Sequence, residues 1–152
     1  MLTYANSVNF VKGELPPVVL RNFSPPEDGF IWSSSSWSEI VFGFSATLAR
    51  GTKRADVNLD LDVFKIVGHL DGQNVLTYLN GLRVGSYHIT QRTTVTLQID
   101  AAILKRNDNV LTFDTPDSRK PSEFGLSDDR RLGIQLFSME IRPEKILSKA
   151  EG

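Results

Sequence analysis

Two alternating runs joined by Asn80-Gly81 restrict the fold of this chain more than any other feature of its sequence. Successive side chains of a strand point to opposite faces, and both runs between residues 74 and 89 have this period of two. Asn and Gly tolerate the positive φ angles that a two-residue β-turn requires. The stretch is therefore predicted to be a β-hairpin. On its first arm, Val75, Thr77 and Leu79 face one side, and Leu76, Tyr78 and Asn80 face the other.

The same alternation recurs along the chain. It is clearest in residues 55–66, where Val, Leu, Leu and Val alternate with Asp, Asn, Asp and Asp. The sequence predicts about nine short strands, separated by turn residues and interrupted by a single helical turn that Asp100 caps. This pattern favours an all-β fold, an antiparallel β-sandwich of the jelly-roll type. The other predicted strands are 7–12, 18–23, 30–32, 39–49, 93–99, 110–115 and 132–142.

Composition excludes several classes of protein. A chain of 152 residues is long enough to bury a core as one domain, 1–152, in which we expect 143–152 to be a frayed tail. It has no cysteine, which excludes disulfides and thiolate metal sites. Lys plus Arg number 17 and Asp plus Glu 18, a balance that does not favour nucleic acid. No signal peptide and no apolar run of about 20 residues is present, so a soluble chain without a membrane span is expected, with its compartment open.

The hairpin and the strands after it resemble galactose-binding-like jelly rolls, which are common as carbohydrate-binding modules and as accessory domains of glycosidases. The shared features lie within residues 73 to 113. They are the hairpin Leu76-Thr77-Tyr78-Leu79-Asn80-Gly81 with Val84-Gly85, the strand 95–99, and the run 104–113 that contains Asn109-Val110-Leu111. This resemblance implies a fold, and it carries no binding residues by itself.

A second resemblance involves Trp32, Trp37-Ser38-Glu39 and the loop from Thr115 to Gly133. These segments look like a β-sandwich domain that is appended to bacterial glycosyltransferases and to membrane proteins of surface-polysaccharide assembly. The match implies a setting that involves glycans. The sequence departs from that domain in its four serines, Ser33 to Ser36, and in having no attached catalytic domain, so its context has to be inferred.

Aromatic and charged side chains supply the candidate ligand-binding residues. Trp32 and Trp37 flank the serine loop and are suited to stacking on a sugar ring; the alternative is that they close the end of the sandwich. The polar loop 116–131, which is expected to have no regular structure, carries an unusual number of charges. These charges could hydrogen-bond a sugar, or they could form an internal network that holds the loop against the sheet. The hydrogen-bonding candidates are Asn80, Arg119, Asp128, Asp129 and Arg130.

Metal and catalytic motifs are sparse. The acidic run of residues 56–62 begins like an EF-hand loop, but Leu61 replaces the required Gly and Val67 the required Glu, so a solvated strand face is expected. No cofactor is predicted, although a structural calcium ion, as many jelly rolls carry, stays open. Only two histidines are present, and neither lies in a catalytic motif.

These observations predict a non-catalytic module that binds bacterial surface carbohydrate, or that assists a protein handling it. The alternative is a structural or protein-interaction domain, which docks a partner enzyme or associates with a second copy. The oligomeric state stays open.

Overall fold

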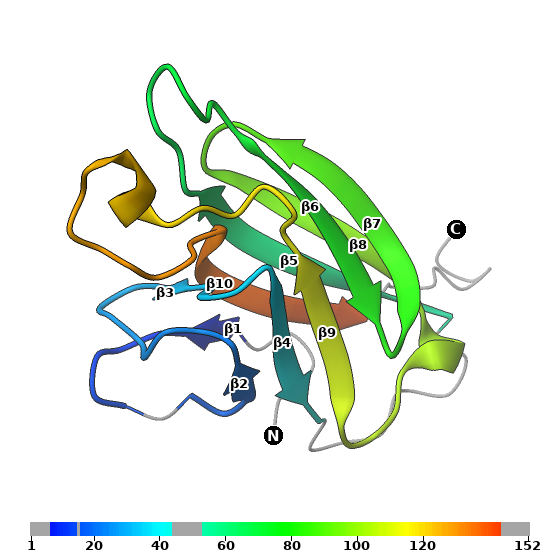
Figure 1. The fold of residues 1–152 in the computed structure, drawn as a ribbon. Coiled ribbons are helices and arrows are strands. Elements are labelled where there is room, and N and C mark those ends of the chain that lie inside the picture. Colours follow the sequence, from blue (N-terminus) through cyan, green and yellow to red (C-terminus); the bar gives the residue numbers. More distant parts are fainter. Residues whose placement is uncertain (1–6, 15, 44–52, 144–152) are drawn as a thin grey trace.

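The computed structural model describes residues 7–14, 16–43 and 53–143. Within this part the chain forms ten strands and two short 3-10 helices (Figure 1). The strands are β1 (Ser7–Asn9), β2 (Val19–Arg21), β3 (Ile31–Trp32), β4 (Trp37–Phe42), β5 (Arg54–Val63), β6 (Gln73–Leu79), β7 (Leu82–Ile89), β8 (Thr93–Asp100), β9 (Asn109–Asp114) and β10 (Ile134–Pro143). The helices are η1 (Ala101–Ile103) and η2 (Pro121–Phe124). None of the described helices is long and apolar enough to cross a membrane.

The strands form two five-stranded sheets in which all pairings are antiparallel. One sheet has the order β1-β10-β5-β8, with β3 also paired to β10, and the other has the order β2-β4-β9-β6-β7. We call them the β5 sheet and the β9 sheet. They pack face to face (Figure 1), which confirms the predicted all-β antiparallel sandwich.

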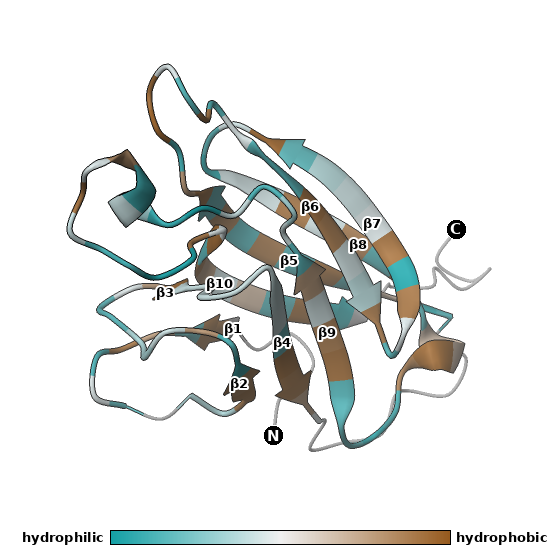
Figure 2. Cartoon of the chain, viewed as in Figure 1, coloured by the Kyte–Doolittle hydropathy of each residue, from teal (hydrophilic) through white to brown (hydrophobic). Residues whose placement is uncertain are grey.

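The core lies between the sheets and follows from the sequence alternation. Along β5 every second residue is buried, from Ala55 to Val63, and the acidic and amide side chains between them are partly exposed. Figure 2 shows the resulting bands of hydrophobic and hydrophilic colour along β5 and β10. One continuous cluster of buried side chains joins both sheets, so the predicted inward residues of 55–66 are confirmed.

The predicted hairpin is present as β6 and β7. Asn80 and Gly81 have φ angles of 50° and 84°, the left-handed values that a two-residue turn needs. A bulge after Thr77 shifts the register, so that Tyr78 lies opposite Arg83. Bulges of this kind increase the local twist of an edge strand.

A pair of asparagines fixes the end of the sandwich where the hairpin turns. The Asn80 amide donates to the Ile103 carbonyl at 2.7 Å and to Asn109 at 3.1 Å, and its oxygen accepts from the Val110 N–H at 2.8 Å. Asn109 is fully buried and in turn bonds the backbone N–H and C=O of Lys105 at 2.7 and 2.6 Å. These contacts hold η1, which Asp100 caps as predicted, against β9.

The structure corrects two expectations. The loop 116–131 was expected to lack regular structure, but it contains η2, because Pro121 fixes a helical φ and Gly125, at φ 85°, ends the turn. The strand predicted at 39–49 begins earlier, at Trp37, because Trp37 pairs with Asp114 of β9. Its second half, and the predicted tail after residue 143, lie outside the described residues.

Candidate functional site

Three connections meet at the opposite end of the sandwich from the Asn80 turn: residues 22–36, 64–72 and 115–133 (Figure 1). Ser33 lies where the chain passes from β3 in the β5 sheet to β4 in the β9 sheet. It is bonded to the first residue of β10, because its N–H donates to the Ile134 carbonyl and its hydroxyl accepts from the Ile134 N–H, at 2.9 and 2.8 Å. Gly133 permits this approach, since a Cβ at that position would lie 2.6 Å from the Thr115 hydroxyl. The serine loop is therefore a closely packed crossover between the sheets.

The two tryptophans lie on different sheets. Trp32 belongs to β3, where its neighbours Ile31 and Ser33 are fully buried, so its own side chain lies on the outer side of the β5 sheet. Its ring is half-buried and meets the rings of Phe30 and Phe64 edge to face, with centroids 6.5 and 6.4 Å away. Trp32 is therefore packed against neighbouring rings on the outer side of the β5 sheet.

Trp37 lies on the outer side of the β9 sheet and is the most accessible aromatic ring. Its side chain is 46% exposed, and no other Phe, Tyr or Trp of the described residues falls in the exposed class. The ring lies beside that of Tyr78, with centroids 5.8 Å apart and planes inclined by 32°. Because β4 and β6 flank β9, this pair bridges β9, and the outward Thr112 beneath it is only 5% exposed. We call Trp37 and Tyr78 the aromatic platform.

A carboxylate without a partner adjoins the platform. Asp114 is the cross-strand neighbour of Trp37 and lies on the same outer side, half-exposed. Among the described residues, no hydrogen bond or ion pair involves its side chain. By contrast, Glu39, the other outward carboxylate of this region, lies 3.7 Å from Arg21. The platform thus has an aromatic surface for an apolar ring face and a free acceptor for hydroxyl groups.

The backbone around Trp37 is fixed locally. Asn22 adopts a left-handed φ of 59°, and its side-chain amide donates to the Trp37 carbonyl at 2.8 Å. The Asn22 carbonyl accepts from the buried hydroxyl of Ser38 at 3.0 Å. Asn22 therefore holds the first two residues of the strand that carries the platform.

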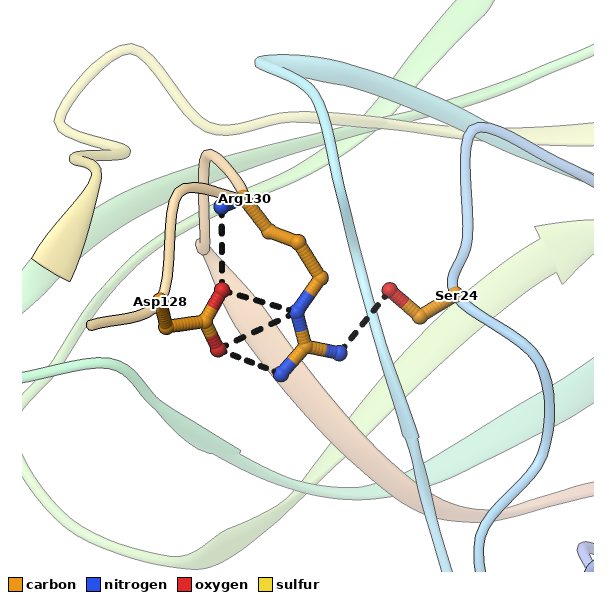
Figure 3. Close-up of polar contacts among 3 residues, drawn as sticks. All are labelled: Ser24, Asp128 and Arg130. Atoms are coloured by element: carbon orange, nitrogen blue, oxygen red, sulfur yellow. Dashed lines mark hydrogen bonds and ion pairs between the residues drawn. The ribbon is translucent and has the colours of Figure 1, made fainter. Parts of the chain in front are cut away.

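Asp128 and Arg130 form an internal pair (Figure 3). The Arg130 guanidinium donates to both oxygens of Asp128, with the shortest contact at 2.6 Å, and also donates to the hydroxyl of Ser24 at 3.1 Å. Ser24 belongs to the connection 22–36, so the pair joins two of the three connections. This arrangement is the internal network that the sequence had left open as an alternative to ligand binding.

The pair makes stability depend on pH. Hydrogen bonds from the Arg130 side chain, and then from its backbone, lower the pKa of Asp128 from its ordinary value of 3.8. A lowered pKa stabilises the fold above pH 3.8, and this contribution is lost as the pH falls through the folded-state value. The two side chains are 40% and 30% exposed, so screening limits the contribution to about 0.5–1 kcal/mol.

We expect Asp128→Asn to lower the free energy of unfolding by about 0.5–1 kcal/mol at pH 7, and by nothing measurable near pH 2. Urea unfolding at both pH values measures the difference. Asp71→Asn is the matched control, since Asp71 makes no hydrogen bond or ion pair within the described part of the chain. An equal loss at both pH values would contradict the assignment.

The remaining sequence candidates divide between the two ends of the sandwich. Asp129 accepts from the Ser122 hydroxyl at 2.8 Å, and Arg119 donates to the Ser118 carbonyl at 3.0 Å, both in the loop 115–133. Asn80 lies at the other end, where its amide is engaged in the contacts described above. The sequence analysis missed Tyr78 and Asp114 as site residues, although the alternation placed Tyr78 on the outward side of its strand.

No group of three or more His, Cys, Asp and Glu that could hold a metal ion occurs among the described residues. The acidic face of β5 is instead engaged by neighbours. Asp60 accepts two hydrogen bonds from Arg92, at 3.0 and 2.9 Å, and Asn58 accepts one from Thr96 at 2.7 Å. Arg92 also lies over the ring of Phe137, 3.6 Å from its centre.

Comparison with known proteins identifies the fold. A β-(1,4)-mannanase from Podospora anserina, described as GH26-CBM35, matches with a TM-score of 0.55 at 11% identity, over 95% of this chain and 29% of the enzyme. The chain has the β-sandwich fold of carbohydrate-binding modules. Two further matches are a CBM36 module in complex with calcium and xylotriose (TM-score 0.43, 14% identity, 90% of this chain and 98% of that one) and a family 35 module from an environmental isolate (0.45, 16%, 90% and 97%). No protein-family model and no curated protein matches the sequence.

Proposed function

We propose that this chain is a non-catalytic carbohydrate-binding module that holds a glycan on the outer side of the β9 sheet. Trp37 and Tyr78 pack against the C–H face of a pyranose ring, and Asp114 accepts hydrogen bonds from the sugar hydroxyls. The observation that carries the proposal is the exposed Trp37 ring beside a carboxylate that has no partner among the described residues.

Three further points support this assignment. An apolar surface with a few convergent polar groups is the usual composition of a small-ligand site. The platform stands on paired strands, so little conformational entropy is lost when a ligand binds. The solved structures of similar fold include a module whose description names xylotriose as its ligand.

The biological setting that we infer is bacterial surface polysaccharide, in which the module binds the glycan or assists a protein that handles it. This inference rests on the resemblance of Trp32, Trp37-Ser38-Glu39 and the loop 115–133 to domains of that machinery.

A second function, docking of a partner protein, is favoured by one observation. Val67 stands at the tip of the connection 64–72 and is 97% exposed, and Leu126, in the loop 115–133, is 55% exposed. Apolar side chains at protruding tips are suited to burial in a protein interface.

A glycan-array screen of the purified chain, run with calcium and with a chelator, tests the proposal. We expect a defined set of glycans to bind, and binding in the chelator would show that the platform acts without a metal. Size-exclusion chromatography of the same sample provides the comparison. A stable oligomer that binds no glycan under either condition would replace the proposal with the protein-interaction function.

A further inference from the structure

The loop 115–133 carries a group of cations without counter-ions. Arg119, Lys120 and Arg131 are all half-buried, and among the described residues none of the three forms an ion pair. The arginines that do form ion pairs with described residues are Arg21, Arg92, Arg130 and Arg142. We call Arg119, Lys120 and Arg131 the basic cluster.

Two guanidinium groups of the cluster converge on one atom. The carbonyl oxygen of Ser118 accepts from Nη1 of Arg119 at 3.0 Å and from Nη1 of Arg131 at 2.8 Å. The backbone brings the two arginines together, because Arg119 and Leu132 exchange both of their N–H to C=O hydrogen bonds. Two like charges this close repel each other, and more strongly in a half-buried setting than in water.

The carboxylates of the same loop do not neutralise this charge. Asp117 accepts a hydrogen bond from the Asn74 N–H at 2.7 Å, Asp128 is held by Arg130, and Asp129 by Ser122. Glu123 is exposed and forms no ion pair in the described part of the chain.

A second observation concerns Ser118, the residue that both arginines contact. Ser118 is fully buried, and its hydroxyl oxygen has no hydrogen-bond partner within the described part of the chain. Buried hydroxyl groups are nearly always paired, so the unpaired hydroxyl of the residue whose carbonyl binds both guanidinium groups is a further donor for an oxygen-bearing ligand.

We propose that Arg119 and Arg131, with Lys120, bind an anionic oxygen group, a carboxylate or a phosphate, that the glycan carries. Guanidinium groups match such groups with paired N–H donors. That the anion comes from a glycan rests on the proposed function, whereas the anion site rests on the basic cluster alone. The ligand class is therefore an acidic polysaccharide.

The position of the cluster suits a glycan that also reaches the platform. Thr115 follows Asp114 directly, and the Ser118 N–H donates to the Thr115 carbonyl at 3.0 Å, so the cluster begins one turn beyond the end of β9. Asp114 repels an anionic group. A neutral face of the glycan therefore lies on Trp37, and its charged substituent lies at the arginines.

Two probes test the proposal at constant ionic strength. The first is inorganic phosphate exchanged for chloride, with the thermal unfolding midpoint as readout, since a ligand that binds the folded state raises it. The second is trigalacturonate compared with its methyl ester by titration calorimetry, a pair in which esterification removes the charge and adds only a methyl group at each carboxyl. We expect phosphate to raise the midpoint, and trigalacturonate to bind at least about tenfold more tightly than its ester, one charge-assisted contact being enough for this ratio.

The variant Arg119→Gln/Arg131→Gln is expected to lose both effects. Arg83→Gln, which changes an exposed arginine that forms no ion pair with any described residue, should retain them. Arg119→Lys/Arg131→Lys should retain part of both, which would show that the fold tolerates replacement of both arginines. Equal responses of the wild type and the double Gln variant would overturn the proposal, even if neutral glycans still bind at Trp37. A response to phosphate without preference for trigalacturonate would overturn the glycan as the source of the anion. If the wild type bound no neutral glycan but still responded to phosphate, the result would count against the proposed function and not against the anion site.

Discussion

Replacing Trp37 with alanine is expected to weaken glycan binding by about 30-fold, the effect of losing about 2 kcal/mol at a binding hot spot. The ring offers the largest accessible aromatic surface among the described residues, and Tyr78, the other ring of the platform, is half-buried and offers less surface to a ligand. The folding free energy should fall by only about 1 kcal/mol, from the lost contact with Tyr78. Titration calorimetry with a glycan from the array, together with urea unfolding, measures both quantities.

Two variants serve as controls for this result. Trp37→Phe keeps an aromatic face and should retain most of the affinity. Trp32→Ala removes a half-buried ring that packs on Phe30 and Phe64, so it should reduce stability and leave the affinity of the folded protein unchanged. If Trp32→Ala abolished binding and Trp37→Ala did not, the site would lie on the β5 sheet.

Replacing Asn109 with alanine is expected to destabilise the fold by about 2–4 kcal/mol, because several backbone and side-chain groups lose a partner in a buried place. The Lys105 N–H and C=O and the Asn80 amide all depend on Asn109. Chemical unfolding measures the loss. Asn107→Ala, in the same connection but exposed, should change stability by less than about 0.5 kcal/mol. Similar losses in the two variants would show that the buried network contributes little.

The same network explains why Asn80 stands apart from the other sequence candidates. Its amide already satisfies the Ile103 carbonyl, Asn109 and the Val110 N–H. Asn80, which with Gly81 predicts the hairpin, thus also stabilises the end of the sandwich through its side chain. A turn residue with a polar side chain resembles a ligand-binding residue in sequence, and only the paired strand shows what its amide contacts.

Local patterns predicted the fold because the side-chain period of a strand is visible in a single segment. Residues 54–63 illustrate this: the alternation of Val and Leu with Asp and Asn gives both the strand and its inward face. The cap by Asp100 was predictable for the same reason, since the bond to the Ala102 N–H spans two residues.

The site was less predictable because it depends on pairings between distant segments. Trp32 and Trp37 are five positions apart, yet the crossover at Ser33 sends them to different sheets. Asp114 becomes part of the platform only through its pairing with Trp37 across 77 positions of sequence. Likewise, the charged loop contains both an internal pair, Asp128 with Arg130, and the basic cluster. Arg131 joins that cluster only because the bridge between Arg119 and Leu132 brings the two arginines together.

The most direct test of glycan binding on the β9 sheet is a nuclear magnetic resonance titration. ¹⁵N-labelled protein is titrated with the strongest glycan from the array, and the indole N–H signals of the two tryptophans are followed together with the backbone amides. We expect the Trp37 indole and the amides of residues 76–78 and 112–114 to shift in a saturable manner, and the Trp32 indole to stay unchanged. Saturable shifts confined to Trp32 and the β5 sheet, or no shift with any glycan, would contradict carbohydrate binding at this platform.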